Sequence, residues 1–300
     1  MGLLGPNGAG KTSMVSMLAG LEPIDSGDAW IASSSVTTDL GAARRKLGLC
    51  PQFDALLPLL SARETLRMFA TIRGVPAEVR EALVARTIDE MGLRLKADSR
   101  VGTYSGGNKR KLSVALAMVS DPVVSFLDEP STGMDPKTRR GMWDFLLKMR
   151  AGRGIILTTH SMEEADALAD NIAIMVRGEL RALGPSQSLK SQHGAGYQVT
   201  VRLGGAAAAA VGIDRAFERV STVLATLSPA VKEEPSGTVV KRYEVPAGDA
   251  DLASVFELLT ARAAELAIVD FSVTQTTLED VFLKFARMQK SEWMHNPDDA

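Results

Sequence analysis

The stretch from Gly5 to Thr12 constrains the fold of this chain more than any other. It reads Gly-Pro-Asn-Gly-Ala-Gly-Lys-Thr and fits the pattern G-x-x-x-x-G-K-[ST]. Glycines in such a loop reach backbone angles that a Cβ forbids, so successive amides can point inward at an anion. Lys11 adds a positive charge, and the helix expected to begin there directs the positive end of its dipole at the same point. The stretch therefore predicts a loop that binds the phosphates of a nucleotide.

In this interpretation Thr12 also offers its hydroxyl to Mg²⁺. We expect the phosphate contacts to come from Gly5, Asn7, Gly8, Ala9, Gly10, Lys11, Thr12 and Ser13. The alternative is a plain glycine-rich turn between a strand and a helix. Only Met1 to Leu4 precede the loop, so most of the strand that should lead into it is missing, and we expect a fragment or a truncated gene model.

The composition limits the classes of function that can surround this loop. The chain has 300 residues, of which 45% are hydrophobic and 23% charged, enough for one large domain or two ordinary ones. The net charge of −2 and the pI near 6.0 argue against a general nucleic-acid surface. The single cysteine, Cys50, excludes an internal disulfide. No apolar run approaches the roughly 18 residues of a membrane-spanning helix.

Strand and helix patterns alternate along the first two thirds of the chain, which predicts an α/β fold with a mostly parallel sheet covered by helices. Two successive helices interrupt this alternation, as an inserted helical subdomain would. We expect strands at 29–32, 47–50, 123–127, 154–158 and 172–176. We expect helices at 11–19, 62–72, 76–91, 136–149 and 162–168, the second of them capped by Ser61 and Glu64.

The composition shifts near His193, where we place a domain boundary. Strands at 197–203, 239–245 and 268–274 alternate with helices at 206–227, 251–266 and 277–288 beyond it. This pattern predicts a small α/β domain over residues 197–288, after a nucleotide-binding domain over residues 1–193. It has no phosphate loop and no paired acids at a strand end, so we expect it not to contact the nucleotide. Residues 289–300 are expected to form a flexible tail.

Two carboxylates, Asp128 and Glu129, end the apolar strand that begins at Val123. A nucleotide on a phosphate loop needs an acid at a neighbouring strand end to hold Mg²⁺, and Asp128 fits that role. Glu129 is then placed to polarise a water beside the γ-phosphate. The alternative is an acidic strand end at the surface.

Further polar residues follow other strands or precede a helix. Gln52 is placed to offer its amide oxygen to Mg²⁺ or to the attacking water, although it is also consistent with an ordinary loop glutamine. His160 follows a strand at the ligand-binding edge of the sheet, although a structural role is common for a single histidine. Ser105 is placed to cap a helix, and the glycines after it leave amides for an anion, unless they form only a helix cap. We expect the basic runs 44–46 and 109–111 to be solvated helix faces or neighbours of phosphate.

Together these motifs resemble the nucleotide-binding domain of an ABC (ATP-binding cassette) protein, with a P-loop NTPase core, over residues 1 to about 190. The resemblance implies that two such domains enclose two ATP molecules. The signature segment of one domain closes on the γ-phosphate held by the other, and it corresponds here to Ser105, Gly106, Gly107 and Asn108. The resemblance also assigns a general base to Glu129, the switch histidine to His160 and the Q-loop residue to Gln52. It makes Asp135 an acid that communicates across the dimer.

Finer details resemble the A subfamily of lipid exporters. They lie at residues 104–113, 172–178, 194–197 and 275–282. In that branch a small α/β regulatory domain follows each nucleotide-binding domain. The resemblance implies ATP with Mg²⁺, transmembrane domains as partners and a position on the cytosolic face of a membrane. Two features depart from the family pattern: Asn108 replaces a common glutamine, and the aromatic residue that stacks on adenine upstream of the loop is absent.

Three other interpretations stay open. A soluble ABC ATPase acting on ribosomes or DNA would need a second cassette, a coiled-coil insert or a basic surface. A separate bacterial-type exporter subunit would also fit residues 160–166, and a catalytically silent interaction module would fit the missing N-terminal strands. If membrane domains are the partners, we expect part of an apolar cluster to form a groove for one of their cytoplasmic helices. That cluster consists of Phe53, Leu56, Leu57, Leu59 and Leu60.

Overall fold

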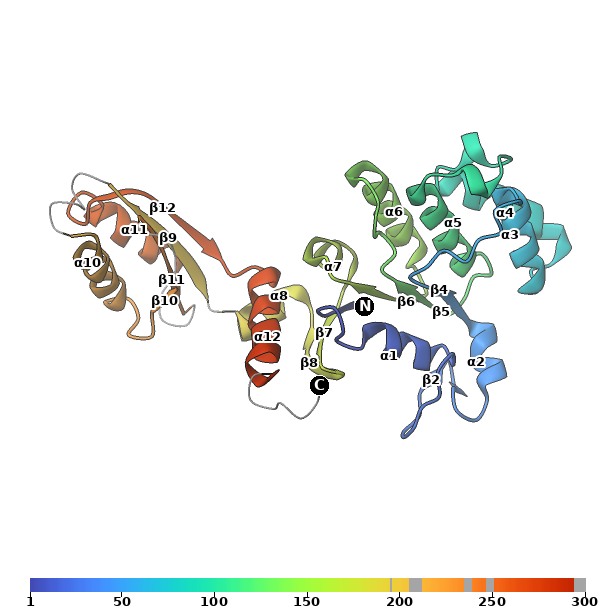
Figure 1. Cartoon of the computed structure of the whole chain (residues 1–300), viewed down its shortest axis with the longest axis horizontal. Helices are drawn as coiled ribbons and strands as arrows, with labels where there is room; N and C mark the ends of the chain where they lie inside the picture. The colour runs from blue at the N-terminus through green and yellow to red at the C-terminus, as the bar shows by residue number, and fades with distance from the viewer. Residues whose placement is uncertain (195, 205–211, 235–238, 247–250, 294–300) are drawn as a thin grey trace. The chain divides into compact units, whose positions relative to one another are not determined.

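The computed structural model describes residues 1–194, 196–204, 212–234, 239–246 and 251–293. The chain divides into two compact units, residues 1–185 with those from Phe285 onward, and residues 186–284 (Figure 1). The division falls after Pro185, ahead of the boundary that we expected near residue 193, so helix α8 (Ser186–His193) groups with the second unit. The carbonyl of His193 accepts a hydrogen bond from Lys284 Nζ at 3.0 Å, which fastens the end of α8 within that unit. A functional boundary at residue 193 stays a prediction.

A six-stranded sheet forms the centre of the first unit, in the order β4-β5-β6-β1-β7-β8. Its strands are β1 (Gly2–Leu4), β4 (Leu47–Cys50), β5 (Val124–Asp128), β6 (Gly154–Thr159), β7 (Ile172–Val176) and β8 (Glu179–Gly184). Neighbouring strands are parallel except β8, which pairs antiparallel to β7. The mostly parallel α/β sheet is therefore as predicted, with one edge hairpin that the sequence analysis did not include. Its turn residues Arg177 and Gly178 both have positive φ, as a tight hairpin requires.

Helices cover both faces of this sheet. Successive residues of a strand point to opposite faces, and β5 shows the result. Phe126 belongs to a buried cluster with Val15 and Ala43, whereas Leu127 belongs to another with Leu112. Because both faces are buried, β5 carries apolar side chains on both of them, Phe126 on one and Leu127 on the other. The helices are α1 (Lys11–Leu18), α2 (Leu40–Lys46), α5 (Gly106–Met118), α6 (Pro136–Met149) and α7 (Met162–Leu168), and a small hairpin joins β2 (Trp30–Ile31) to β3 (Ser34–Ser35).

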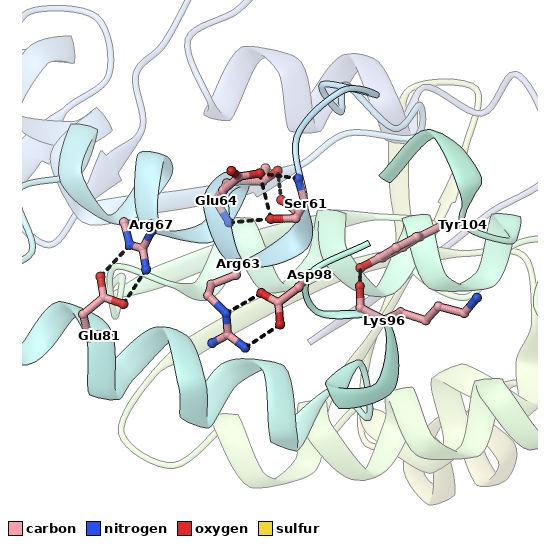
Figure 2. Close-up of polar contacts among 9 residues, drawn as sticks. Ser61, Arg63, Glu64, Arg67, Glu81, Lys96, Asp98 and Tyr104 are labelled. Carbon is pink, nitrogen blue, oxygen red and sulfur yellow. Dashed lines mark hydrogen bonds and ion pairs between the residues drawn. The ribbon is translucent and has the colours of Figure 1, made fainter. Parts of the chain in front are cut away.

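The predicted helical insertion consists of α3 (Ala62–Ile72) and α4 (Ala77–Glu90), followed by short 3₁₀ turns at Arg94–Lys96 and Val101–Thr103. The capping box that we predicted is present: Ser61 Oγ accepts from the Glu64 amide at 3.2 Å, and Glu64 Oε2 accepts from the Ser61 amide at 2.8 Å (Figure 2). These two bonds satisfy amides that the first turn would otherwise leave unpaired.

Ion pairs on the surface connect the parts of this insertion. Arg67 of α3 donates to Glu81 of α4 at 2.7 Å, and Arg63 donates to Asp98 at 2.7 Å (Figure 2). Exposed pairs of this kind contribute little to stability, because water screens them. The Tyr104 hydroxyl, in contrast, is on a buried residue and donates to the carbonyl of Lys96. This bond fixes the chain immediately before Ser105.

The second unit is a four-stranded antiparallel sheet in the order β10-β11-β9-β12. Helices α10 and α11 pack against it through a core that includes Val201, Phe217, Tyr243 and Val255. After α8, its elements are β9 (Tyr197–Leu203), α10 (Ile213–Ala225), β10 (Lys232–Glu234), β11 (Val240–Val245), α11 (Leu252–Arg262) and β12 (Ile268–Gln275). The last helix, α12 (Leu278–Trp293), begins in this unit, and its residues from Phe285 onward group with the first unit.

Several of these elements differ from our expectations. Strand β10 was not predicted, and α11 ends at Arg262, ahead of the expected residue 266. We expected a helix from residue 206, but α10 begins at Ile213, and residues 205–211 lie outside the described residues. Helix α12 continues to Trp293, past Met288, because residues 289–293 include no glycine or proline to stop it. The part of the expected tail beyond Trp293 also lies outside the described residues.

Candidate functional site

The ends of three adjacent parallel strands meet at one edge of the first unit's sheet. In the register of the sheet, Leu4 of β1 lies opposite Thr159 of β6, and Asp128 of β5 lies opposite Thr158. The residues that follow these strands therefore come together, although they are far apart in sequence. The carboxyl edge of such a sheet is where α/β proteins bind ligands.

The loop after β1 has the shape of an anion cradle. A Cβ on Gly5 would lie 2.6 Å from the carbonyl oxygen of Met175, so no larger residue fits there. Gly10 has φ 98° and occupies the N-cap of α1, where no side chain accepts from the first amides. Thr12 and Ser13 in the first turn are exposed. These amides are thus available to an anion, as the sequence predicts.

Lys11 occupies the inside of this loop. Its side chain is buried, and Nζ donates to the carbonyls of Gly5 and Pro6 at 2.8 and 3.1 Å. An ammonium has three donors, so one remains for a ligand. Burial lowers the pKa of Lys11 below its ordinary value, and the carboxylates of Glu129 and Asp128 oppose this shift. The lysine is a positive charge enclosed by the loop, suited to a phosphate.

Asp128 lies beside the loop and connects two strand ends. Its Oδ2 accepts from Thr12 Oγ1 at 2.9 Å, and its Oδ1 accepts from Thr158 Oγ1. The hydroxyl and the carboxylate that we predicted for Mg²⁺ are therefore adjacent. The described residues contain no cluster of three or more His, Cys, Asp or Glu that would hold a metal alone. The donors fit Mg²⁺, which is commonly bound by one or two carboxylates together with substrate phosphates.

Glu129 points in a different direction from Asp128, as predicted for adjacent residues at a strand end. Its backbone has φ 49°, an uncommon left-handed conformation for a residue with a side chain. Oε1 lies 3.2 Å from Nδ1 of His160, and Oε2 accepts from Thr132 Oγ1 at 2.9 Å. The Glu129 side chain is 11% exposed and that of His160 57%. A largely enclosed carboxylate beside a solvent-facing imidazole is suited to orient a water and move its proton.

Gln52 is connected to the other residues of the site by its backbone carbonyl and not by its side chain. Its side chain is exposed, and its carbonyl accepts from Arg110 Nη1 at 3.2 Å. We expected the run 109–111 to be a solvated helix face or a neighbour of phosphate, and for Arg110 the solvated face was wrong: its side chain is 5% exposed. The helix turns it away from its basic neighbours, onto the same stripe as the buried residues Val114 and Ala117. That spacing is the signal that would have identified it.

The signature segment lies at the start of α5. Ser105 caps the helix by accepting from the Asn108 amide at 3.4 Å, while Ser105 and Gly106 are exposed. No hydrogen bond in the described part of the chain joins this segment to the phosphate loop.

Asp135 caps α6 by accepting from the Thr138 amide at 3.0 Å, and its hydrogen bonds with Thr138 lower the pKa of its carboxyl group. Thr132, Thr158 and Arg110 are site residues that the sequence analysis missed.

Comparison with known families agrees with this geometry. The profile described as "ABC transporter" matches residues 1–132, and the one described as "ABCA1-like, C-terminal R1 regulatory domain" matches residues 194–275. The chain belongs to the ABC family. Its relatives place it in the A subfamily, so the predicted family and the predicted subfamily are both confirmed.

Three of these relatives are named as A-subfamily members or phospholipid-transporting ATPases. The whole chain is 47% identical over 296 residues to ATP-binding cassette sub-family A member 7 of Rattus norvegicus, covering 97% of this chain and 13% of that protein. It is 43% identical over 291 residues to Phospholipid-transporting ATPase ABCA3 of Homo sapiens, covering 96% and 17%. It is 42% identical over 297 residues to Retinal-specific phospholipid-transporting ATPase ABCA4 of Homo sapiens, covering 96% and 12%. The cassette thus spans less than a fifth of the length of these relatives.

Experimental structures share the fold of the first unit. An ATP-binding subunit of an ABC transporter has a TM-score of 0.60 and 27% identity, with 64% of this chain and 81% of that chain covered. A dimeric ATP-binding cassette in a post-hydrolysis state, bound to ADP and Pi, has a TM-score of 0.56 and 23% identity, with 61% and 84% covered. The predicted P-loop fold class is therefore confirmed. No helix among the described residues of the cassette combines the length and apolar character needed to cross a membrane.

Proposed function

We propose that this cassette binds ATP with Mg²⁺ and hydrolyses it to drive lipid movement by transmembrane domains. The observation that carries the proposal is the arrangement at the carboxyl edge of the sheet. Thr12 and Asp128 form a hydrogen-bonded pair at 2.9 Å beside the enclosed Lys11, and Glu129 lies 3.2 Å from His160. The names of the relatives ABCA3 and ABCA4, both phospholipid-transporting ATPases, support a lipid as the transported substrate.

The residues divide the chemistry between them. The amides of the loop and the Lys11 ammonium would bind the phosphates, while Thr12, Asp128 and Gln52 would hold the metal. Bound Mg²⁺ supplies positive charge that offsets the negative charge of the phosphates. Glu129 orients the attacking water, and His160 supports the Glu129 carboxylate from its solvent side. Catalysis then consists mostly of positioning and charge neutralisation.

The signature segment serves a second cassette. Ser105 and Gly106 are exposed at the start of α5, and they would close on the γ-phosphate held by a partner cassette, with Asp135 beside the interface. The dimeric state of the related ADP-bound cassette supports this arrangement at the level of the fold. The second unit acts as a regulatory domain that does not contact the nucleotide, in line with the regulatory-domain profile that it matches.

Transmembrane partners would meet the loop that follows Gln52. Phe53 is 82% exposed, Leu59 75% and Leu57 47%, whereas Leu56 packs against the core and Leu60 is half-buried. The three exposed side chains offer an apolar contact for a cytoplasmic helix of a transmembrane domain. The proposal thus places the cassette on the cytosolic face of a membrane.

The experiment that tests this function replaces Glu129 by glutamine in the full chain. Glu129→Gln keeps the shape of the side chain but not its charge, so turnover should fall on the order of 10²-fold or more while ATP stays bound. Lys11→Ala should instead weaken nucleotide binding, because it removes a direct phosphate contact. Turnover and the affinity for a fluorescent ATP analogue are measured for both variants. Hydrolysis by Glu129→Gln at the unaltered rate would refute the assignment and make His160 the next residue to test.

A further inference from the structure

Arg110 is a buried cation that the proposed reaction does not use directly. It lies in the second turn of α5, the helix that the signature segment begins. Only 5% of its side chain is exposed, and burying a guanidinium is costly unless its donors are all paired. Its partners come from two loops. They are the carbonyls of Pro51, Gln52, Asp128, Glu129 and Pro130 and the carboxylate of Asp54.

These partners lie next to Gln52 on one loop and next to Glu129 on the other. On one loop, Arg110 Nη1 donates to the Pro51 carbonyl at 2.6 Å and to Asp54 Oδ1 at 3.2 Å, so it clamps the segment that carries Gln52. Ser113 of α5 donates to the same Asp54 oxygen at 2.8 Å. The turn of α5 that contains Arg110 and Ser113 is thus fastened to the Gln52 loop at two points.

On the other loop, Nη2 donates to the carbonyl of Asp128 and, at 3.1 Å, to that of Glu129. These carbonyls lie on either side of the left-handed Glu129 residue, whose φ is 49°. An uncommon backbone conformation persists only where its surroundings hold it. The guanidinium holds this residue from its carbonyl side while Thr158 holds its amide, and together they set the direction in which the Glu129 carboxylate points.

We propose that Arg110 is a positioning residue that ties the signature helix α5 to the Glu129 and Gln52 segments. The proposal rests on the proposed function, in which Glu129 orients water and Ser105 meets the nucleotide of a second cassette. Docking of the signature segment would act on α5, and the fork of Arg110 would pass that constraint to both loops at once. A lysine has the charge but not the planar set of donors needed to hold both loops.

The test compares Arg110→Met and Arg110→Lys with a matched arginine elsewhere in the full chain. Arg73 is suited as the control because it is also partly buried and donates to the Arg44 carbonyl and to Ser120 Oγ, each at 3.1 Å, away from the site. We expect Arg110→Met to lower kcat by about 10- to 100-fold, since small displacements of a catalytic group cost rates of this order. Its affinity for ATP should change by less than about threefold, because Arg110 does not contact the phosphate loop. Arg73→Met should lower the melting temperature and leave kcat within about twofold.

Two further measurements decide the remaining outcomes. Arg110→Lys keeps a positive charge opposite Asp54, so it tests the fork if Arg110→Met fails to fold, and we expect its kcat to fall by about tenfold. In a Glu129→Gln background, Arg110→Met should lower kcat by less than about twofold more, because both changes remove the same contribution. Normal kcat in folded Arg110→Lys or Arg110→Met, or a parallel loss of ATP affinity, would overturn the inference while leaving the role of Glu129 intact. Normal kcat in Glu129→Gln alone would instead count against the proposed function.

Discussion

Thr158 offers a measurement of how the proposed magnesium site is held. Its side chain is fully buried, and Oγ1 donates to Asp128 Oδ1 while accepting from the Glu129 amide at 3.0 Å. Thr158→Val keeps the shape of the side chain but removes both bonds. Asp128, which is 3% exposed, then loses the partner of its Oδ1.

The size of the effect follows from these contacts. A hydrogen bond to a charged group is worth about 1.5–3 kcal/mol, whereas the Glu129 amide keeps the Thr158 carbonyl at 3.2 Å and loses less. We therefore expect a loss of about 2–3 kcal/mol in the free energy of unfolding. This corresponds to a melting temperature lower by about 5–10 °C in a unit of this size. Misorienting the ligand carboxylate should also raise the Mg²⁺ concentration for half-maximal turnover by about 10- to 100-fold.

The assay measures initial rates of ATP hydrolysis against Mg²⁺ concentration, together with thermal unfolding by circular dichroism without nucleotide. Thr158→Ser is the control, because it keeps the hydroxyl and should shift the Mg²⁺ dependence by less than about threefold. The reasoning fails if Thr158→Val shows the Mg²⁺ dependence of the unaltered chain, since Asp128 would then need no partner on β6.

Two further experiments, one substitution and one labelling measurement, test the fold around the site. Ser61→Ala removes the capping box of α3 and should lower the free energy of unfolding by about 1 kcal/mol, seen as a melting temperature lower by about 2–4 °C. Ser61→Thr keeps the cap and is the control, and an unchanged melting temperature in the alanine variant contradicts the prediction. Burial raises the pKa of the Cys50 thiol to about 12 from 9.0, so its thiolate fraction at pH 8 should be about 10³-fold smaller than that of an unperturbed thiol. Iodoacetamide should therefore modify Cys50 only when urea unfolds the protein, and mass spectrometry detects the modification. Rapid labelling of the folded protein would contradict the burial of Cys50.

Elements with local start and stop signals were predictable from the sequence. Helix α6 begins at Pro136 after the capping Asp135 and α3 begins after the Ser61 cap, and the structure has both as expected. The residues of the candidate site were predictable for a related reason. Parallel strands bring their carboxyl ends to one edge, so polar residues after Leu4, Leu127 and Thr159 had to meet there.

The missed features depend on contacts between distant segments. Arg110 looks like its neighbours in a basic run, and only the two loops that pack on α5 make it a buried residue. Thr158 looks like an ordinary strand residue until the register places it opposite Asp128. Hairpin strand β8 follows β7 directly after the turn at Arg177 and Gly178, so no intervening helix pattern marked it. Pairing register and loop packing are set by the whole sheet, which local sequence signals do not encode.

The contacts that the β7–β8 hairpin makes with the phosphate loop have a consequence for folding during synthesis. Met175 approaches Gly5 closely, and the Gly178 amide donates to the Ala9 carbonyl at 2.9 Å. The phosphate loop is therefore shaped by residues that leave the ribosome long after it does. Long-range contacts of this kind form late, and domains generally fold as units once their chain is available. A nascent chain that ends before β7 should carry the complete loop sequence without its cradle, and nucleotide affinity should arise only when the last strands of the unit have emerged.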